Sequence, residues 1–160
     1  LDAPDHLDGG GISGNTPLIW AADAGHVSVV EMLVASGVDV NVRGVLGATA
    51  YCRASRKGHV AVLHALFDAA SASPSGTPVD VDMPNLKMQH PLHFAAFKQQ
   101  TEAVDVLLAH GANPLVLDRK GRIPAEDTKN PGIREVLLAA AQARISSELG
   151  GSGIGLLDPK

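Results

Sequence analysis

One segment recurs along this chain at a nearly fixed interval, and this recurrence restricts the possible folds more than any other feature. Thr16 recurs as Thr49, a shift of 33, and the next shift, to His90, is 41. The last shift, from His90 to Ile123, is again 33. A register kept through three transitions predicts an array of similar units, each of which buries its apolar face only against its neighbours.

The first copy carries the local signals of a helix, a turn and a second helix. Thr16 is a good N-cap, and Pro17 is favoured at the first position of a helix. Gly25 is expected to end this helix, because glycine adopts the left-handed conformation needed there. An apolar stripe at helical spacing then predicts a second helix, which Gly37 closes. The stripe consists of Val27, Val30, Leu33 and Val34.

These copies resemble a known repeat family. Residues 16–21, Thr-Pro-Leu-Ile-Trp-Ala, match the Thr-Pro-Leu-His-x-Ala signature of ankyrin repeats except at Ile19. The period of that family, about 33 residues, also agrees. The copy at 90–96, His-Pro-Leu-His-Phe-Ala-Ala, is nearest to the signature. The resemblance implies an all-α fold, an ankyrin-repeat solenoid of stacked helix-turn-helix units with β-hairpin-like loops. The expected domain spans 14–143, with units one to four at about 11–43, 44–84, 85–117 and 118–143.

The remaining segments are expected to lie outside the regular units. Residues 1–13 are a Gly-rich leader or the remnant of a preceding repeat, and 144–160 are a tail or linker. The chain begins with Leu rather than Met, so we expect a fragment or a processed product. Unit two contains an insert at 71–78 whose composition is that of a solvated loop. Its Ser-Pro and Thr-Pro pairs are possible phosphorylation sites, but turn residues are the favoured interpretation.

Two units depart from the signature. Unit two has Ala50-Tyr51-Cys52 where Pro-Leu-His is expected, so its first helix, expected over Ala50–Lys57, lacks the Pro start. We therefore expect unit two to be the least rigid unit. Unit four has a short first helix and polar residues at positions that are apolar in the other units. This is what a capping repeat needs, because nothing stacks on its far side.

Composition excludes several classes of function. The single Cys52 excludes an internal disulfide and a Cys-rich zinc site. A net charge of −4 does not favour nucleic-acid binding, and no apolar run is long enough to span a bilayer. With one Trp, one Tyr and three Phe, the core must be built from Ala, Val and Leu. We expect a monomeric intracellular protein, either cytoplasmic or nuclear.

No catalytic, cofactor-binding or metal-binding constellation is expected. The histidines lack metal-ligand spacing, and His26 and His59 occupy the same position of successive units. His93 stands at the signature position. Cys52 has no base or acid nearby in its unit, so a small packed side chain is favoured over a nucleophile.

The resemblance implies a non-catalytic scaffold or adaptor that binds proteins through its concave side, made of hairpin tips and exposed positions of the first helices. Nine of the 13 Lys and Arg residues fall in this set, whereas most acids fall on second helices. The hypothesis is therefore a protein or peptide partner that is acidic, with one or two apolar anchors. The expected binding residues are Ile12, Trp20, Arg43, Leu46, Arg53, Arg56, Lys57, Leu86, Lys87, Phe94, Phe97, Lys98, Arg119, Lys120 and Arg122.

Other interpretations stay open. In one, the cations only solubilise exposed tips, and the apolar tip residues, among them Leu46 and Leu86, either meet a partner or pack on each other. In another, the domain is the regulatory or substrate-recruiting arm of a larger enzyme. Nucleic-acid binding is weaker, because stackable aromatics are few. An aromatic cage for a modified lysine would rest on Trp20 and Phe94 alone.

Overall fold

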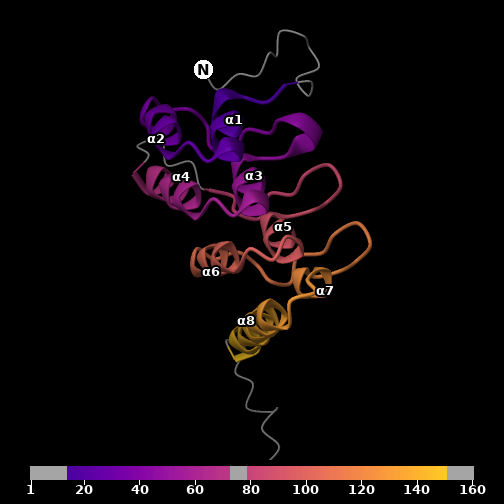
Figure 1. Ribbon diagram of the computed structural model, residues 1–160. Helices are drawn as coiled ribbons and strands as arrows, with labels where there is room; N and C mark the ends of the chain where they lie inside the picture. Colours follow the sequence, from indigo (N-terminus) through magenta and orange to yellow (C-terminus); the bar gives the residue numbers. More distant parts are fainter. Residues whose placement is uncertain (1–13, 73–78, 151–160) are drawn as a thin grey trace, which may run out of the picture.

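The computed structural model describes residues 14–72 and 79–150, which form pairs of antiparallel helices (Figure 1). Within these ranges no residue belongs to a β-strand. The first helices of the four units are α1 (Pro17–Ala24), α3 (Ala50–Lys57), α5 (Pro91–Phe97) and α7 (Pro124–Asp127). The second helices are α2 (Val27–Ala35), α4 (Val60–Ala72), α6 (Thr101–Ala109) and α8 (Pro131–Gly150). A 3-10 turn, η2 (Val45–Gly47), lies in the loop between α2 and α3.

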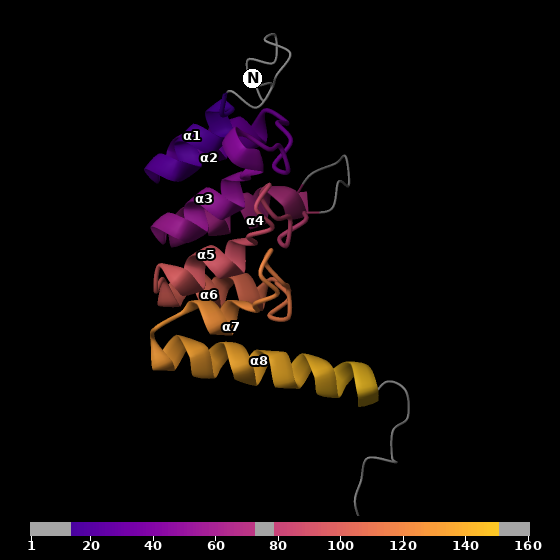
Figure 2. The same cartoon turned by 90° about the vertical axis from the view of Figure 1, so that its right-hand side faces the viewer.

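The helices stack in two columns. In Figures 1 and 2, α1, α3, α5 and α7 follow one another down the molecule, and the second helices form a parallel column beside them. Each first helix contacts the next, and so does each second helix. The loops between units project from one side. The expected all-α solenoid is confirmed.

The core is made of small and aliphatic side chains, as the composition predicts. Ala22, Ala54 and Ala96 are fully buried where consecutive first helices pack, because a methyl group lets two helices approach closely. Leu and Val residues fill the space between the two columns. The only large aromatic side chain that is completely buried in the described ranges is Tyr51, which takes the place of a leucine in unit two.

The predicted ends of the first helices are confirmed. The Thr16 hydroxyl accepts a hydrogen bond from the Ile19 backbone N–H at 3.2 Å, and Thr49 accepts one from Cys52 at the same distance. Gly25 ends α1 with φ +80°. Although unit two lacks the Pro start, α3 forms over the whole predicted range.

The end of the domain differs from the expectation. Helix α8 continues to Gly150, beyond the predicted boundary at residue 143, and Figure 2 shows it extending past the other helices. Its sequence after 143 consists of residues that a helix tolerates, and no Pro or Gly interrupts it before Gly150. Helix α7, by contrast, spans only Pro124–Asp127, as the short unit-four helix predicts.

In residues 14–72 and 79–150, no helix combines the length and apolarity needed to pass through a bilayer. The leader at 1–13, the two dipeptides considered for phosphorylation and residues 151–160 lie outside the described residues.

Candidate partner-binding groove

A groove of about 600 Å³ runs along the side on which the first helices and the loop tips meet. Its walls come from the tip at 45–48, the tip at 85–89, helices α3 and α5, and the segment that includes α7. It therefore spans units two, three and four. Of the fifteen expected binding residues, eight line this groove: Leu46, Arg53, Arg56, Lys87, Phe94, Phe97, Lys98 and Arg122.

The other seven lie elsewhere. Ile12 is outside the described residues, and Trp20 lies on α1, which contributes no residue to the groove. Trp20 is 62% exposed, so its ring lies on the protein surface outside the groove. The rest do not line the groove either: Arg43, Lys57, Leu86, Arg119 and Lys120.

Two arginines tie neighbouring loop tips together. The Arg43 guanidinium donates a hydrogen bond to the Pro84 carbonyl, in the next loop along the chain. The Arg119 guanidinium donates to the Leu86 carbonyl at 2.7 Å. Both residues are one loop away from their acceptor, so these bonds link consecutive tips and fix the positions of the two side chains.

Where the column of first helices begins, at α1, two cationic side chains form ion pairs with one aspartate. Arg53 lies 3.7 Å from one carboxylate oxygen of Asp23, and Lys57 lies 3.5 Å from the other. Asp23 stands on α1 and its two partners on α3, so the ion pairs join units one and two. The single negative charge of Asp23 thus offsets one of these two positive charges, and the three residues together keep a net charge of +1.

At the α7 end, Arg122 lies between two aspartates. Its guanidinium is 3.0 Å from Asp118 and 3.1 Å from Asp127, whose side chains are only 6% and 8% exposed. Burial alone would raise the pKa of Asp118, but hydrogen bonds from the Arg122 and Lys120 backbone N–H groups and from the Arg122 side chain outweigh it, and the pKa is lowered. Burial raises the pKa of Asp127, and the attraction of Arg122 offsets this only in part.

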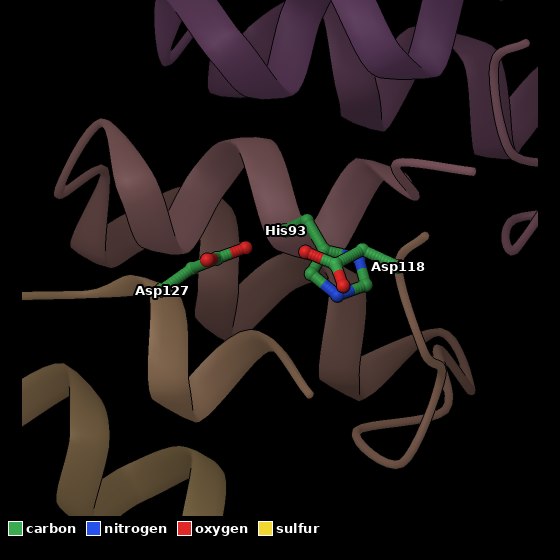
Figure 3. Close-up of side chains that lie close together, drawn as sticks. All are labelled: His93, Asp118 and Asp127. Atoms are coloured by element: carbon green, nitrogen blue, oxygen red, sulfur yellow. The ribbon is translucent and has the colours of Figure 1, made fainter. Parts of the chain in front are cut away.

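His93 completes this cluster, as Figure 3 shows. Its Nδ1 accepts a hydrogen bond from the His90 backbone N–H at 3.2 Å, so the proton is on Nε2, which donates to the Arg122 carbonyl at 2.9 Å. One ligand atom each from His93, Asp118 and Asp127 lie within 4.8 Å of one another, a spacing that suits a metal ion. Both imidazole nitrogens and both carboxylates already have partners, however, so the arrangement favours a structural link between units three and four.

Three of the expected groove cations keep their charge available. Arg56, Lys87 and Lys98 are exposed, and in the part of the chain that the structure describes none of them makes an ion pair. The Lys98 ammonium lies 5.8 Å from the centre of the Phe97 ring, a cation–π arrangement. Three cations without an ion-pair partner among the described residues therefore line the part of the groove that units two and three form.

Apolar surface accompanies these cations. Leu46 is 53% exposed, Leu86 54% and Phe97 60%. Leu86 also packs against the neighbouring tip, where its Cγ would lie only 2.9 Å from a Cβ added at Gly47, and its N–H bonds to the Leu46 carbonyl. The tips thus pack on each other and still expose apolar side chains, and contact of these side chains with a partner stays a prediction.

Some groove residues at the α7 end were not expected from the sequence: Glu126, Asp127, Lys129 and Arg134. Asp127 occupies the position of Phe94 in the repeat register, so continuing that register into unit four would have found it. The Arg134 guanidinium donates to two backbone carbonyls of the α7 segment, and Lys129 is exposed. With Arg122 included, this end of the groove therefore carries both cations and acids, and neither sign dominates.

Cys52 also lines the groove, although no role in binding was predicted for it. It is almost fully buried, and burial raises the pKa of its thiol. A thiol that stays protonated is a poor nucleophile, so the expected packing role is favoured.

The aromatic cage has little geometric support. Phe94 lines the groove and Trp20 does not. Helix α3 lies between α1 and α5, which carry these two rings (Figure 1).

Comparisons with known proteins place this geometry in context. A family model described as "Ankyrin repeat" matches residues 13–45 and 88–119. The chain is 38% identical over 95 residues to "Probable E3 ubiquitin-protein ligase XBOS33" of Oryza sativa subsp. japonica, an alignment that covers 59% of this chain and 17% of that protein. It is 29% identical over 132 residues to "Ankyrin repeat and SOCS box protein 11" of Danio rerio, covering 82% of this chain and 42% of the relative. The chain thus spans less than half the length of these relatives.

Proposed function

The chain belongs to the ankyrin-repeat family and is a protein-interaction module, and from this premise we propose that its groove binds a protein segment that is acidic with one or two apolar anchors. The observation that carries the proposal is the composition of the groove. Cations from α3, α5 and a loop tip flank exposed aromatic and aliphatic side chains in one continuous hollow. Aromatic residues and arginine are the usual anchors of protein interfaces.

The charge distribution favours an acidic partner over nucleic acid. Acids offset part of the positive charge at both ends of the groove, and the chain as a whole carries a net charge of −4. Binding of a nucleic-acid backbone needs many unbalanced cations along its path. A short acidic segment needs only a few, and its apolar residues find a place on Phe94 and Phe97.

The proposal is tested by a pull-down with the purified chain at low and high salt. The matched variant carries Arg56→Glu, Lys87→Glu and Lys98→Glu together. Arg119 is left unchanged, because its guanidinium bonds to the Leu86 carbonyl and its loss would disturb the tips. The expected result is a partner that is retained by the wild type, weakened by salt and lost with the variant, since exposed charges are screened at high ionic strength.

A control keeps this test specific. Arg144→Glu reverses one charge on α8, outside the groove, and should retain the partner. A thermal unfolding curve of the triple variant checks that it is folded. Retention of the same partner by the folded triple variant at both salt concentrations would contradict the groove, and the search would turn to the convex side.

We also infer a second candidate, a regulatory or substrate-recruiting domain of a larger enzyme. It is favoured by the relatives named as E3 ubiquitin-protein ligases, of whose length this chain covers 17%. In this candidate the chain contributes recognition, and catalysis belongs to another domain. The complete reading frame tests it: a catalytic domain in the same polypeptide supports it, and a frame without one leaves the adaptor.

A further inference from the structure

Helix α2 of unit one exposes apolar side chains whose counterparts in the next units are buried. Val29 is 40% exposed, whereas Val62 and Ala103, at the same register position of units two and three, are completely buried. Met32 is 65% exposed, whereas Ala65, at its position in unit two, is 8% exposed. These positions are apolar in each of the three units, so the difference lies in what covers them.

Helix α1 shows the same difference. Pro17 in its first turn is exposed, whereas the residues at this position in the later units, Ala50, Pro91 and Pro124, are all buried. Both helices of unit one therefore contribute to one uncovered surface, which we call the end face. It consists of Pro17, Val29 and Met32, and α1 and α2 stand at one end of the described stack (Figure 1).

The neighbours of each unit identify what is missing from the end face. Unit one has a following neighbour, because α3 contacts α1 and α4 contacts α2. The cover that the same positions have in units two and three must then come from the unit before them. Unit four agrees with this: Val136, at the position of Val29, is 40% exposed where α8 contacts α6 less extensively than α6 contacts α4. The end face is thus the surface that a preceding unit would cover.

A polar side chain has the same unfilled role. The His59 imidazole lies 3.1 Å from the Asp23 carbonyl, and the Gln100 amide donates to the Arg56 carbonyl at 3.2 Å. Each of these contacts joins the residue before a second helix to the first helix of the preceding unit. His26 occupies this position in unit one. It is exposed, and within the described ranges its side chain makes no hydrogen bond.

We propose that the end face is the interface for one further helix pair, which precedes unit one in the same polypeptide and stacks on it in the same register. That helix pair covers Pro17, Val29 and Met32, and the last turn of its first helix offers a main-chain carbonyl to His26. The occupant is inferred from the contacts that units two and three already make, since in such arrays each unit buries its apolar positions against its neighbours. The groove contains none of these residues, so this inference is independent of the acidic partner.

The test compares this chain with the polypeptide encoded by the complete reading frame. Hydrogen exchange measured by mass spectrometry is read in peptides from α1 and α2. Both helices should exchange roughly tenfold more slowly in the longer polypeptide, because the added helix pair opposes their local opening. Two variants of each protein assign this protection. Met32→Glu should remove it, whereas Ser28→Glu should keep it, because the position of Ser28 is exposed in units one, two and three.

Substitutions of His26 test the predicted hydrogen bond in the longer polypeptide. His26→Ala should reduce the protection of α1 and α2. His26→Gln should keep it, because Gln100 makes the equivalent contact in unit three. In the shorter chain, where the end face is uncovered, Met32→Glu and both His26 variants should leave the exchange of these helices unchanged, which also shows that the variants fold.

Three results would overturn the proposal. The first is equal exchange of α1 and α2 in the two proteins, and the second is a reading frame that encodes no helix pair before unit one. The third concerns a second copy of this chain, which is the competing occupant. Sedimentation velocity over a series of concentrations detects it: a dimer that Met32→Glu dissociates and Ser28→Glu retains would assign the end face to self-association.

Discussion

At the scale of single residues, the same contact between units is made by different side chains. The His59 imidazole lies 3.1 Å from the Asp23 carbonyl, and the Gln100 amide donates to the Arg56 carbonyl at 3.2 Å. The two acceptors occupy equivalent positions of successive units, so Gln100 does for unit three what His59 does for unit two. The substitution of His by Gln in the repeat signature therefore leaves the link between units intact.

The His59 contact requires Gly25, and this predicts the effect of Gly25→Ala. Gly25 has φ +80°, and a Cβ there would lie 2.8 Å from the His59 ring. Ala should lower the free energy of unfolding by about 2 kcal/mol or more, because the left-handed strain and the clash add. Urea unfolding measures this. Gly37→Ala is the control, since Gly37 has φ +93° with no atom within 4 Å of an added Cβ, and it should cost less. Equal losses would contradict the role assigned to His59.

A substitution at Tyr51 is predicted to raise the free energy of unfolding, whereas Gly25→Ala lowers it. Its side chain is completely buried against Phe67, with ring centres 5.0 Å apart, and its hydroxyl has no hydrogen-bond partner. Removal of an unsatisfied buried polar group usually stabilises, so Tyr51→Phe should raise the free energy of unfolding by about 1 kcal/mol. Phe67→Leu in the same pair serves as a comparison and should destabilise. Loss of stability in Tyr51→Phe would mean that the hydroxyl has a partner in solution.

At the scale of elements, the first helices start in one backbone geometry that different side chains support. The residues before α1, α3, α5 and α7 all have ψ between 160° and 172°. Thr16 and Thr49 cap with a hydroxyl, whereas in unit four the Glu126 carboxylate accepts from the Ile123 N–H at 2.9 Å. In unit three, His90 occupies the threonine position. It is buried, and its Nδ1 has no hydrogen-bond partner.

This start of α5 predicts a pH dependence. Burial, assisted by the neighbouring His93, lowers the pKa of His90 from 6.5 to about 4. Between pH 6.5 and 4, His90 is therefore protonated in the unfolded chain and neutral in the folded chain. The free energy of unfolding falls as the pH falls from about 6.5 to about 4. The full loss should be about 3 kcal/mol, since each pKa unit corresponds to about 1.4 kcal/mol. Urea unfolding at a series of pH values measures it.

His90→Thr is the variant that isolates this effect. By analogy with Thr16 and Thr49, the new hydroxyl should accept from the His93 N–H and restore the cap, worth about 1 kcal/mol at neutral pH. It should also flatten the decline between pH 6.5 and 4, because the buried imidazole is gone. An unchanged pH profile in the variant would assign the decline to other groups.

At the scale of the whole molecule, stability should follow nearest-neighbour contacts. Helix α3 packs against both α1 and α5, so unit two joins unit one to unit three. Unit two lacks the Pro start and the signature His, and we predict that it opens most easily. Hydrogen exchange measured by mass spectrometry should show faster exchange in α3 than in α1 and α5. Equal protection of the three helices would contradict this.

The sequence by itself determined the array and the limits of α1 and α3. The repeat register, Thr16-Pro17 and Gly25 predicted the helix pairs, because caps, turns and apolar stripes are local signals that act within a few residues. Even α3 was predicted over its full length without its Pro. The local pattern after residue 143 consists of residues compatible with either a helix or a linker, and so α8 was predicted too short.

Only the tertiary structure decided which charges are available to a partner. The sequence predicted nine cations on one side, but not that Asp23 pairs with Arg53 and Lys57, or that Asp118 and Asp127 pair with Arg122. The Asp23 pairs join residues about one repeat apart in the sequence, at distances set by how the units stack. An ion pair depends on a separation of a few ångströms, which the register of a repeat does not specify.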